Sequence, residues 1–201
     1  MPTLGVLLAG GRGARLGGEH PKALVPCGGR TLFARALETL EPLCDEVVVV
    51  APAGMELPVA RARRVDDPPG ARGPLPALLA GFSAGAFDQA VVMAVDMPLV
   101  TAAALRELAA LRGEALAVMT APGGVWQPLA AWYVSGARAP LAAAHDAGER
   151  SVIAACRALA PAIVDDAARA RVPDGEGFEW NVNTPEDLAH VERLLSERAA
   201  R

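Results

Sequence analysis

Apolar and polar positions alternate in blocks along the chain, and these blocks predict strands and helices in turn. Residues 3–9, TLGVLLA, form a near-continuous apolar run, the pattern of a strand that is covered on both faces. Four consecutive valines within 46–51 indicate a second strand, because β-branched side chains favour extended backbone. The same reasoning predicts further strands at 60–65 (an edge strand), 89–96, 115–121, 125–134 (broken by Pro128) and 162–166.

Segments with apolar side chains at helical spacing lie between these strands. The segment 101–112 carries a leucine stripe and begins at Thr101, whose hydroxyl can cap the first helical turn. The last helix begins with a capping pattern in which Thr184 is the cap, Pro185 the first helical residue and Asp187 the acid of the first turn. Further helices are predicted at 31–43, 73–86, 136–147 and 150–160, with a loop over 168–180.

The alternation of strands and helices predicts an α/β fold with a mostly parallel sheet, formed by one domain over residues 1–201. In open sheets of this kind the ligand lies at the carboxyl ends of the strands. Two stretches fall at such ends: the glycine-rich loop after the first strand, and Asp96 after the strand that begins at residue 89. These stretches are therefore the first places to look for a ligand site.

Composition narrows the class of ligand. The chain is 52% hydrophobic with a formal net charge of −4, which argues against disorder and against a nucleic-acid partner. Small phosphorylated ligands are more plausible. The first residues lack the pattern of a signal peptide and no apolar stretch approaches about 18 residues, so we expect a cytoplasmic protein without a membrane span. The three cysteines show no metal-ligand spacing and are expected to be ordinary small thiols.

The glycine loop, LLAGGRGARLGG, matches neither common phosphate-binding motif. A dinucleotide fingerprint needs a third glycine where this chain has Leu16, and no acid follows the second strand to hold a ribose hydroxyl. A P-loop needs Gly-Lys-Ser/Thr, whereas Lys22 lies between Pro21 and Ala23. What remains is a long glycine loop with the fixed positive charges of Arg12, Arg15 and Lys22, which suits a triphosphate.

Several motifs in fixed order resemble a known family. They are LLAGGRGARLGG followed by Pro21-Lys22, DD at 66–67, GPL at 73–75, VDMPLV at 95–100, QPLAAWY at 127–133 and NVNTPEDL at 181–188. Together they resemble the nucleotidyltransferases that activate a phosphorylated small molecule with an NTP, and most of all the molybdenum cofactor guanylyltransferase family. The resemblance implies a three-layer α/β/α, Rossmann-like sheet of the nucleotide-diphospho-sugar transferase type.

The resemblance also implies roles for individual residues and for a metal. Arg15, Lys22 and Asp96 would be catalytic, and Asp96 would bind Mg²⁺, a cation that prefers oxygen ligands. Gln127, Asn181 and Asn183 are candidates for contacting the acceptor or supporting the metal. The nucleotide-binding residues would be Leu8, Ala9, Gly10, Gly11, Arg12, Gly13, Lys22, Asp67, Gly73 and Leu75.

The resemblance implies GTP and molybdopterin as partners, with other cofactor-biosynthesis proteins as candidates, and neither nucleic acid nor membrane. The alternatives are a cytidylyltransferase for the same pterin, a transferase for a sugar or polyol phosphate, and a non-catalytic nucleotide-binding regulator. Asp96 and Lys22 together argue against the regulator. The sequence Leu8-Ala9-Gly10-Gly11 favours GTP, whereas Pro21-Lys22 and the 95–100 stretch look more like the cytidylyl relatives.

Overall fold

The computed structural model describes residues 2–11, 13, 16, 21–59, 62–70 and 73–200. Its centre is a seven-stranded sheet in the order β5-β4-β1-β6-β8-β7-β9. Neighbouring strands are parallel except that β8 runs antiparallel to both β6 and β7. The strands are β1 (Thr3–Leu8), β4 (Glu46–Ala51), β5 (Arg63–Asp66), β6 (Gln89–Ala94), β7 (Ala117–Thr120), β8 (Ala130–Val134) and β9 (Ala162–Val164). The prediction of an α/β fold with a mostly parallel sheet is confirmed.

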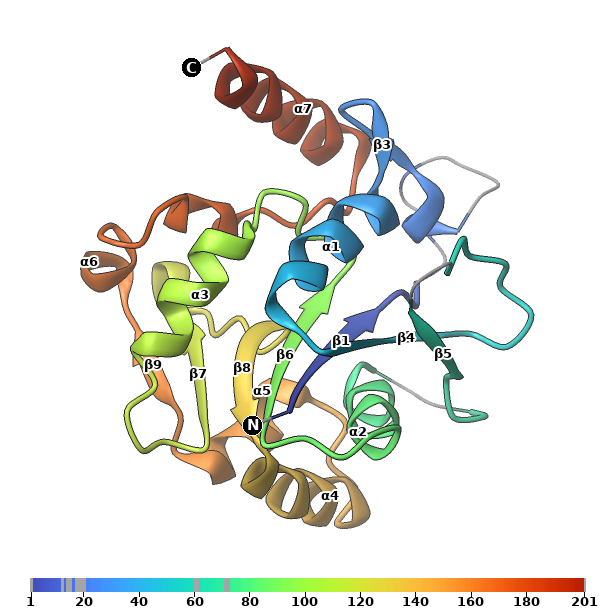
Figure 1. Ribbon diagram of the computed structural model, residues 1–201, viewed down its shortest axis with the longest axis vertical. Coiled ribbons are helices and arrows are strands. Elements are labelled where there is room, and N and C mark those ends of the chain that lie inside the picture. Colours follow the sequence, from blue (N-terminus) through green and yellow to red (C-terminus); the bar gives the residue numbers. More distant parts are fainter. Residues whose placement is uncertain are drawn as a thin grey trace.

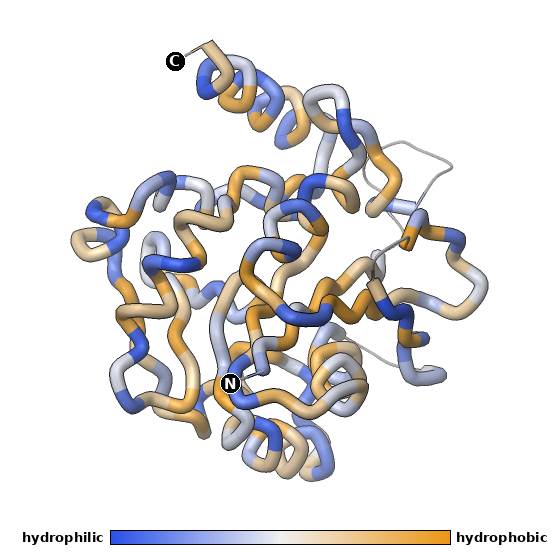
Figure 2. Tube along the Cα trace, viewed as in Figure 1, coloured by the Kyte–Doolittle hydropathy of each residue, from blue (hydrophilic) through white to orange (hydrophobic). Residues whose placement is uncertain are grey.

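Helices cover both faces of the sheet (Figure 1). They are α1 (Leu32–Leu40), α2 (Leu75–Ser83), α3 (Ala102–Ala110), α4 (Arg138–Asp146), α5 (Val152–Cys156), α6 (Asp166–Arg169) and α7 (Pro185–Ala199). Side chains of β1 alternate between two apolar cores: Leu7 packs in the one that holds α1 and α3, and Leu8 in the one that holds α2, α4 and α5. Figure 2 shows the apolar segments gathered in the central strands, as expected for a sheet buried on both sides.

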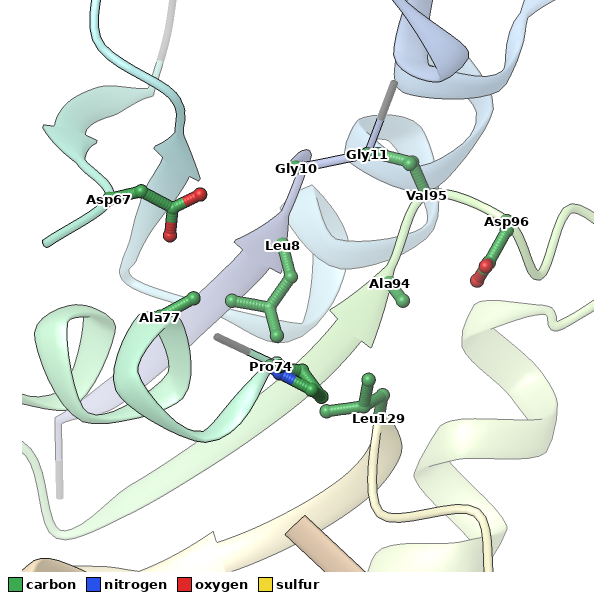
Figure 3. Close-up of a pocket in the computed structure, with 11 residues that line it drawn as sticks. Leu8, Gly10, Gly11, Asp67, Pro74, Ala77, Ala94, Val95, Asp96 and Leu129 are labelled. Carbon is green, nitrogen blue, oxygen red and sulfur yellow. The ribbon is translucent and has the colours of Figure 1, made fainter. Parts of the chain in front are cut away.

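A glycine lets α2 approach the sheet closely. A Cβ atom placed at Gly81 would lie 2.4 Å from Cγ1 of Val6 in β1, so no side chain fits at this helix position. The close approach seats α2 against β1 and β4. The first turn of α2 then lies beside the carboxyl end of β1, where the glycine loop begins (Figure 3).

Several predicted boundaries were wrong. The strand predicted at 125–134 with a break at Pro128 forms only beyond that break, over Ala130–Val134, and residues 125–127 are not part of it. The loop predicted over 168–180 contains the end of α6, which Asp165 caps, and a 3₁₀ turn over 175–179. Two very short strands, β2 (Pro26–Cys27) and β3 (Arg30–Thr31), were not predicted because two residues carry no periodicity.

The last helix forms as its capping pattern predicts. The Thr184 hydroxyl accepts a hydrogen bond from the Asp187 N–H at 3.2 Å, and the Asp187 carboxylate accepts one from the Thr184 N–H at 2.9 Å. Helix α7 lies beside the β2–β3 hairpin (Figure 1), and Gly28 N–H of the hairpin donates a hydrogen bond to Glu192.

Within the described part of the chain, no helix is long and apolar enough to cross a membrane. The cysteines are free, with Cys27 and Cys156 buried and Cys44 half-buried.

Candidate active site

A cavity of about 370 Å³ opens at the carboxyl edge of the sheet, beyond the ends of β1, β5 and β6. In Figure 3, Asp67 and Asp96 lie on opposite sides of this cavity, with Leu8 and the Gly10–Gly11 backbone between them. We call it the first cavity. It is lined by Leu8, Gly10, Gly11, Asp67, Gly73, Pro74, Ala77, Ala94, Val95, Asp96 and Leu129.

The backbone leaves the sheet at the predicted glycine loop. Ala9 N–H still donates to Val50 of β4 at 2.8 Å, and Gly11 then adopts φ +126°, a conformation that residues with a side chain rarely adopt. The Gly11 carbonyl accepts a hydrogen bond from Lys22 N–H at 3.3 Å, which joins the described ends of the loop. Arg12 and Arg15, to which we assigned phosphate contacts, lie outside the described residues.

Four of the described residues predicted to bind the nucleotide, Ala9, Gly13, Lys22 and Leu75, do not line the first cavity. The Ala9 and Leu75 side chains are fully buried in the two apolar cores, so only their backbones can face a ligand there. Gly13 has φ +60°, and its carbonyl accepts a hydrogen bond from Leu16 N–H. Gly73 does line the cavity, with φ +75° and a Cβ position only 2.9 Å from the Arg150 carbonyl.

Lys22 is held inward by its neighbours in the chain. Pro21 is extended at the start of a 3₁₀ turn, and the side chain of Ala23 is fully buried in the core. The Lys22 ammonium therefore donates hydrogen bonds to Asp96 Oδ2 at 2.7 Å and to Asn183 Oδ1 at 2.8 Å. The lysine side chain is only 10% exposed, so this ion pair is screened less than a surface pair would be.

Asp96 is presented to the site by a buried segment. Among residues 91–100 it alone is half-buried, while every neighbour is buried. The Asp96 carbonyl accepts a hydrogen bond from Val182 N–H at 2.8 Å, and the Val182 side chain is buried in the core. This bond ties the segment before α7 to the end of β6, and so brings Asn181 and Asn183 to the site.

Asn183 is fixed from its other side by the cap of α7. Asp187 Oδ2 accepts hydrogen bonds from the N–H groups of both Asn183 and Thr184, each at 2.9 Å. The hydrogen bond from Asn183 N–H is the largest cause that holds the pKa of Asp187 below its ordinary value, and the positive charge of Lys22 adds to it. The helix cap thus also positions a side chain of the candidate site.

Asp67 lines the first cavity and carries a carboxylate oxygen without a partner among the described residues. Its backbone N–H donates to the Ala51 carbonyl at 2.8 Å, which seats the residue at the end of β4. Burial raises the pKa of the Asp67 carboxyl, and the charge of Asp66 raises it further. Its Oδ1 is buried, and no described residue donates a hydrogen bond to it. A ligand with N–H or O–H donors would satisfy this oxygen.

A second cavity of about 350 Å³ adjoins the first and shares Pro74, Asp96 and Leu129 with it. Gln127 and Asn181 line it, and the Asn181 Oδ1 is buried with no partner among the described residues. Its rim carries the exposed side chains of Val125 and Ile153, which sequence reasoning missed together with Trp126. The one signal in the sequence was that Trp126 directly precedes Gln127, a candidate for contacting the acceptor. Asp96 therefore lies between two cavities.

The donor set near Asp96 fits a divalent cation that completes its coordination with ligand oxygens. The carboxylate of Asp96 and the amide oxygen of Asn183 already converge on one positive charge, the Lys22 ammonium. Both are hard oxygen donors of the kind that Mg²⁺ prefers. Within the described ranges, no group of three or more His, Cys, Asp and Glu side chains could hold a metal. A cation here would therefore depend on oxygens that a bound ligand supplies.

This fold and site define a class: an α/β protein with two adjoining cavities that share a carboxylate, which is paired with a largely buried ammonium group. Comparison with known proteins narrows the class. Residues 5–162 match the family model described as the MobA-like NTP transferase domain. The chain is 36% identical to the molybdenum cofactor guanylyltransferase of Cereibacter sphaeroides, covering 99% of this chain and all of that protein. It is 34% identical to that of Ectopseudomonas mendocina, covering 94% and 90%. The chain belongs to the molybdenum cofactor guanylyltransferase family of MobA-like NTP transferases.

Solved structures share the fold at lower identity. The molybdopterin-guanine dinucleotide biosynthesis protein A of Archaeoglobus fulgidus superposes with a TM-score of 0.74 at 24% identity, over 96% of this chain and 99% of that one. The 2-C-methyl-D-erythritol 4-phosphate cytidylyltransferase of Thermus thermophilus superposes with a TM-score of 0.67 at 23% identity, over 94% and 97%. The fold is therefore shared by a molybdopterin-guanine dinucleotide biosynthesis protein and by a cytidylyltransferase.

Proposed function

We propose that this protein transfers GMP from GTP to the phosphate of molybdopterin and releases pyrophosphate. One oxygen of the acceptor phosphate attacks the α-phosphorus, the bond from that phosphorus to the bridging oxygen of the β-phosphate breaks, and pyrophosphate leaves with the electron pair. The observation that carries the proposal is the meeting of two cavities at Asp96, whose carboxylate is paired with the Lys22 ammonium. Such a transfer needs two substrates held in line and charge stabilisation, and little covalent chemistry from the protein.

The first cavity suits the nucleoside of GTP. Its lining includes the backbone of the Gly10–Gly11 turn and the carboxylate of Asp67, one oxygen of which has no partner among the described residues. Guanine carries two adjacent N–H donors on one edge, at N1 and the exocyclic amine, and a carboxylate with two oxygens accepts such a pair. The raised pKa of Asp67 is consistent with a carboxyl that lacks donors until a ligand supplies them.

The second cavity suits the acceptor. Its lining combines apolar side chains with a few polar groups, among them Gln127 and the unpaired oxygen of Asn181. This is the usual composition of a pocket that orients a ring-bearing ligand. Because the two cavities meet at Asp96, an acceptor phosphate there would lie next to the α-phosphate of a nucleotide in the first cavity.

Asp96 and Asn183 would hold Mg²⁺, which would neutralise charge on the phosphate oxygens when bound. Lys22 contributes a second positive charge, which can stabilise the negative charge that develops on the departing pyrophosphate. Asp187 accepts a hydrogen bond from the Asn183 backbone N–H and so helps to position the Asn183 side chain.

The test of the proposal is a panel of NTPs against phosphorylated acceptors with pyrophosphate release as the readout. Release that requires GTP and molybdopterin supports it.

The choice between GTP and CTP tests the base assignment. We expect GTP to be preferred by at least about tenfold in kcat/KM, roughly 1.4 kcal/mol of differential binding. Gly10→Ala should reduce that preference, because a Cβ atom there would lie 3.1 Å from Asp67 Oδ2 and would press on the carboxylate. Measuring kcat/KM for both nucleotides with one acceptor decides the point. Equal values, or a preference for CTP, would make the protein a cytidylyltransferase.

Asp67→Asn should separate stability from binding. The pKa of Asp67 is higher in the folded protein than in the unfolded chain, so the ionised carboxylate disfavours folding. Stability therefore falls as the pH rises from the unfolded-state pKa to the folded-state pKa. At neutral pH the variant should melt at the same temperature as the parent or higher, while its KM for GTP rises about tenfold. The exposed neighbour provides a control, Asp66→Asn, which should leave the KM for GTP unchanged. An unchanged KM in Asp67→Asn would remove this residue from the nucleotide site.

A further inference from the structure

The Lys22 ammonium lies where a metal ion would be expected. It is within 2.7 Å of Asp96 Oδ2 and 2.8 Å of Asn183 Oδ1, and its side chain is 10% exposed. A carboxylate oxygen and an amide oxygen that converge on one point are a partial coordination shell for a hard cation. In this conformation the protein supplies its own cation to that shell.

Lys22 is the only lysine of the chain. Lysine and arginine together number 19, so the other 18 basic residues are arginines. An ammonium is a compact point charge with three rotatable donors, whereas a guanidinium is a planar fork that pairs side by side with one carboxylate. The Lys22 ammonium lies between oxygens from two different elements as one compact charge, as a small cation does.

The described side-chain oxygens near Lys22 are too few to bind a metal ion while the ammonium is present. Outside the masked positions, no cluster of three or more acidic, histidine or cysteine side chains is available, and the two described oxygens that meet the ammonium are one carboxylate and one amide oxygen. One carboxylate cannot balance an ammonium and a divalent cation together. A nucleotide triphosphate carries several negative charges, which are enough to draw the ammonium and to complete the metal's coordination.

We infer that Lys22 is an internal cation that closes the metal position in the nucleotide-free protein, so that the metal enters only with a nucleotide. On nucleotide binding the ammonium leaves Asp96 and Asn183 for the phosphates, and these two oxygens become metal ligands. The inference rests on the proposed function for the identity of the nucleotide and deepens it by assigning a binding order. It concerns binding alone, and no bond is made or broken in it.

The test is a titration of the nucleotide-free protein with Mn²⁺, a paramagnetic probe whose free form is counted by electron paramagnetic resonance. The parent should bind Mn²⁺ weakly, and Lys22→Met should bind one equivalent at least about tenfold more tightly. Lys22→Gln should show the same gain, and Lys22→Arg should not, because it keeps the charge. The double variant Lys22→Met with Asp96→Asn should return to weak binding, which assigns the gained site to Asp96. Arg30→Met removes an exposed cation and is the control for net charge.

Two results overturn the inference. One is Mn²⁺ binding in Lys22→Met and Lys22→Gln that is no tighter than in the parent, with both variants folded by circular dichroism. The other is tight stoichiometric Mn²⁺ binding to the nucleotide-free parent. Failure of the proposed function is distinguishable, because it shows as absent transfer with GTP and molybdopterin and does not alter a titration that contains neither.

Discussion

Asp96→Asn is expected to keep the fold and to reduce turnover by on the order of 10²–10³, the scale of losing one major electrostatic stabiliser. The amide has nearly the same shape as the carboxylate and can still accept a hydrogen bond from the Lys22 ammonium. It cannot supply the negative charge that a divalent cation needs. Because Asp96 lies between the two cavities, this loss falls on the point where the acceptor phosphate and the α-phosphate would meet.

The measurement is Mg²⁺-dependent pyrophosphate release at saturating substrates, with folding checked by thermal melting. Asp88→Asn is the matched control: Asp88 is an exposed aspartate just before β6, at the end of that strand opposite to Asp96. It should behave as the parent. Near-normal turnover in Asp96→Asn would show that the metal and the reacting phosphates lie elsewhere.

The parts of this fold that follow from local pattern could be predicted from the sequence. The apolar run of β1, the valines of β4 and the capping box of α7 each depend on residues within a few positions of one another. The direction of β8 could not be predicted, because the apolar pattern of a strand is the same whether it runs parallel or antiparallel. The break of this strand at Pro128 was predicted, but the absence of residues 125–127 from the sheet was not, because only the ladder reveals which residues find partners.

The candidate site depends on contacts between distant residues. Lys22 meets Asp96 across 74 positions of sequence and Asn183 across 161. The motifs nominated each of these residues singly, and the rule that ligands lie at the carboxyl ends of strands predicted a common edge. Neither indicated that the lysine pairs with the aspartate directly. The second cavity was less predictable still, because Val125 and Ile153 belong to no polar motif.

Lys22→Met is expected to reduce turnover severely, on the order of 10² or more, because the variant loses the charge that meets the phosphates and keeps the apolar stem. We expect the melting temperature to change by only a few degrees. The Asp96 side chain is 22% exposed, so its carboxylate keeps contact with water when the ammonium is removed. In a domain of this size a loss of 1 kcal/mol lowers the melting temperature by about 2–4 °C.

The informative comparison is between turnover and metal binding in the same variant. If the ammonium only filled the metal position, its removal would let Mg²⁺ bind earlier and turnover would persist or improve. If it also neutralises the phosphates, Lys22→Met should bind Mn²⁺ more tightly without nucleotide and yet turn over slowly at saturating Mg²⁺. We expect this second result, because a triphosphate carries more negative charge than one divalent cation balances. A large fall in melting temperature, with activity per folded molecule preserved, would instead make Lys22 a structural residue that holds Asp96 and Asn183 together.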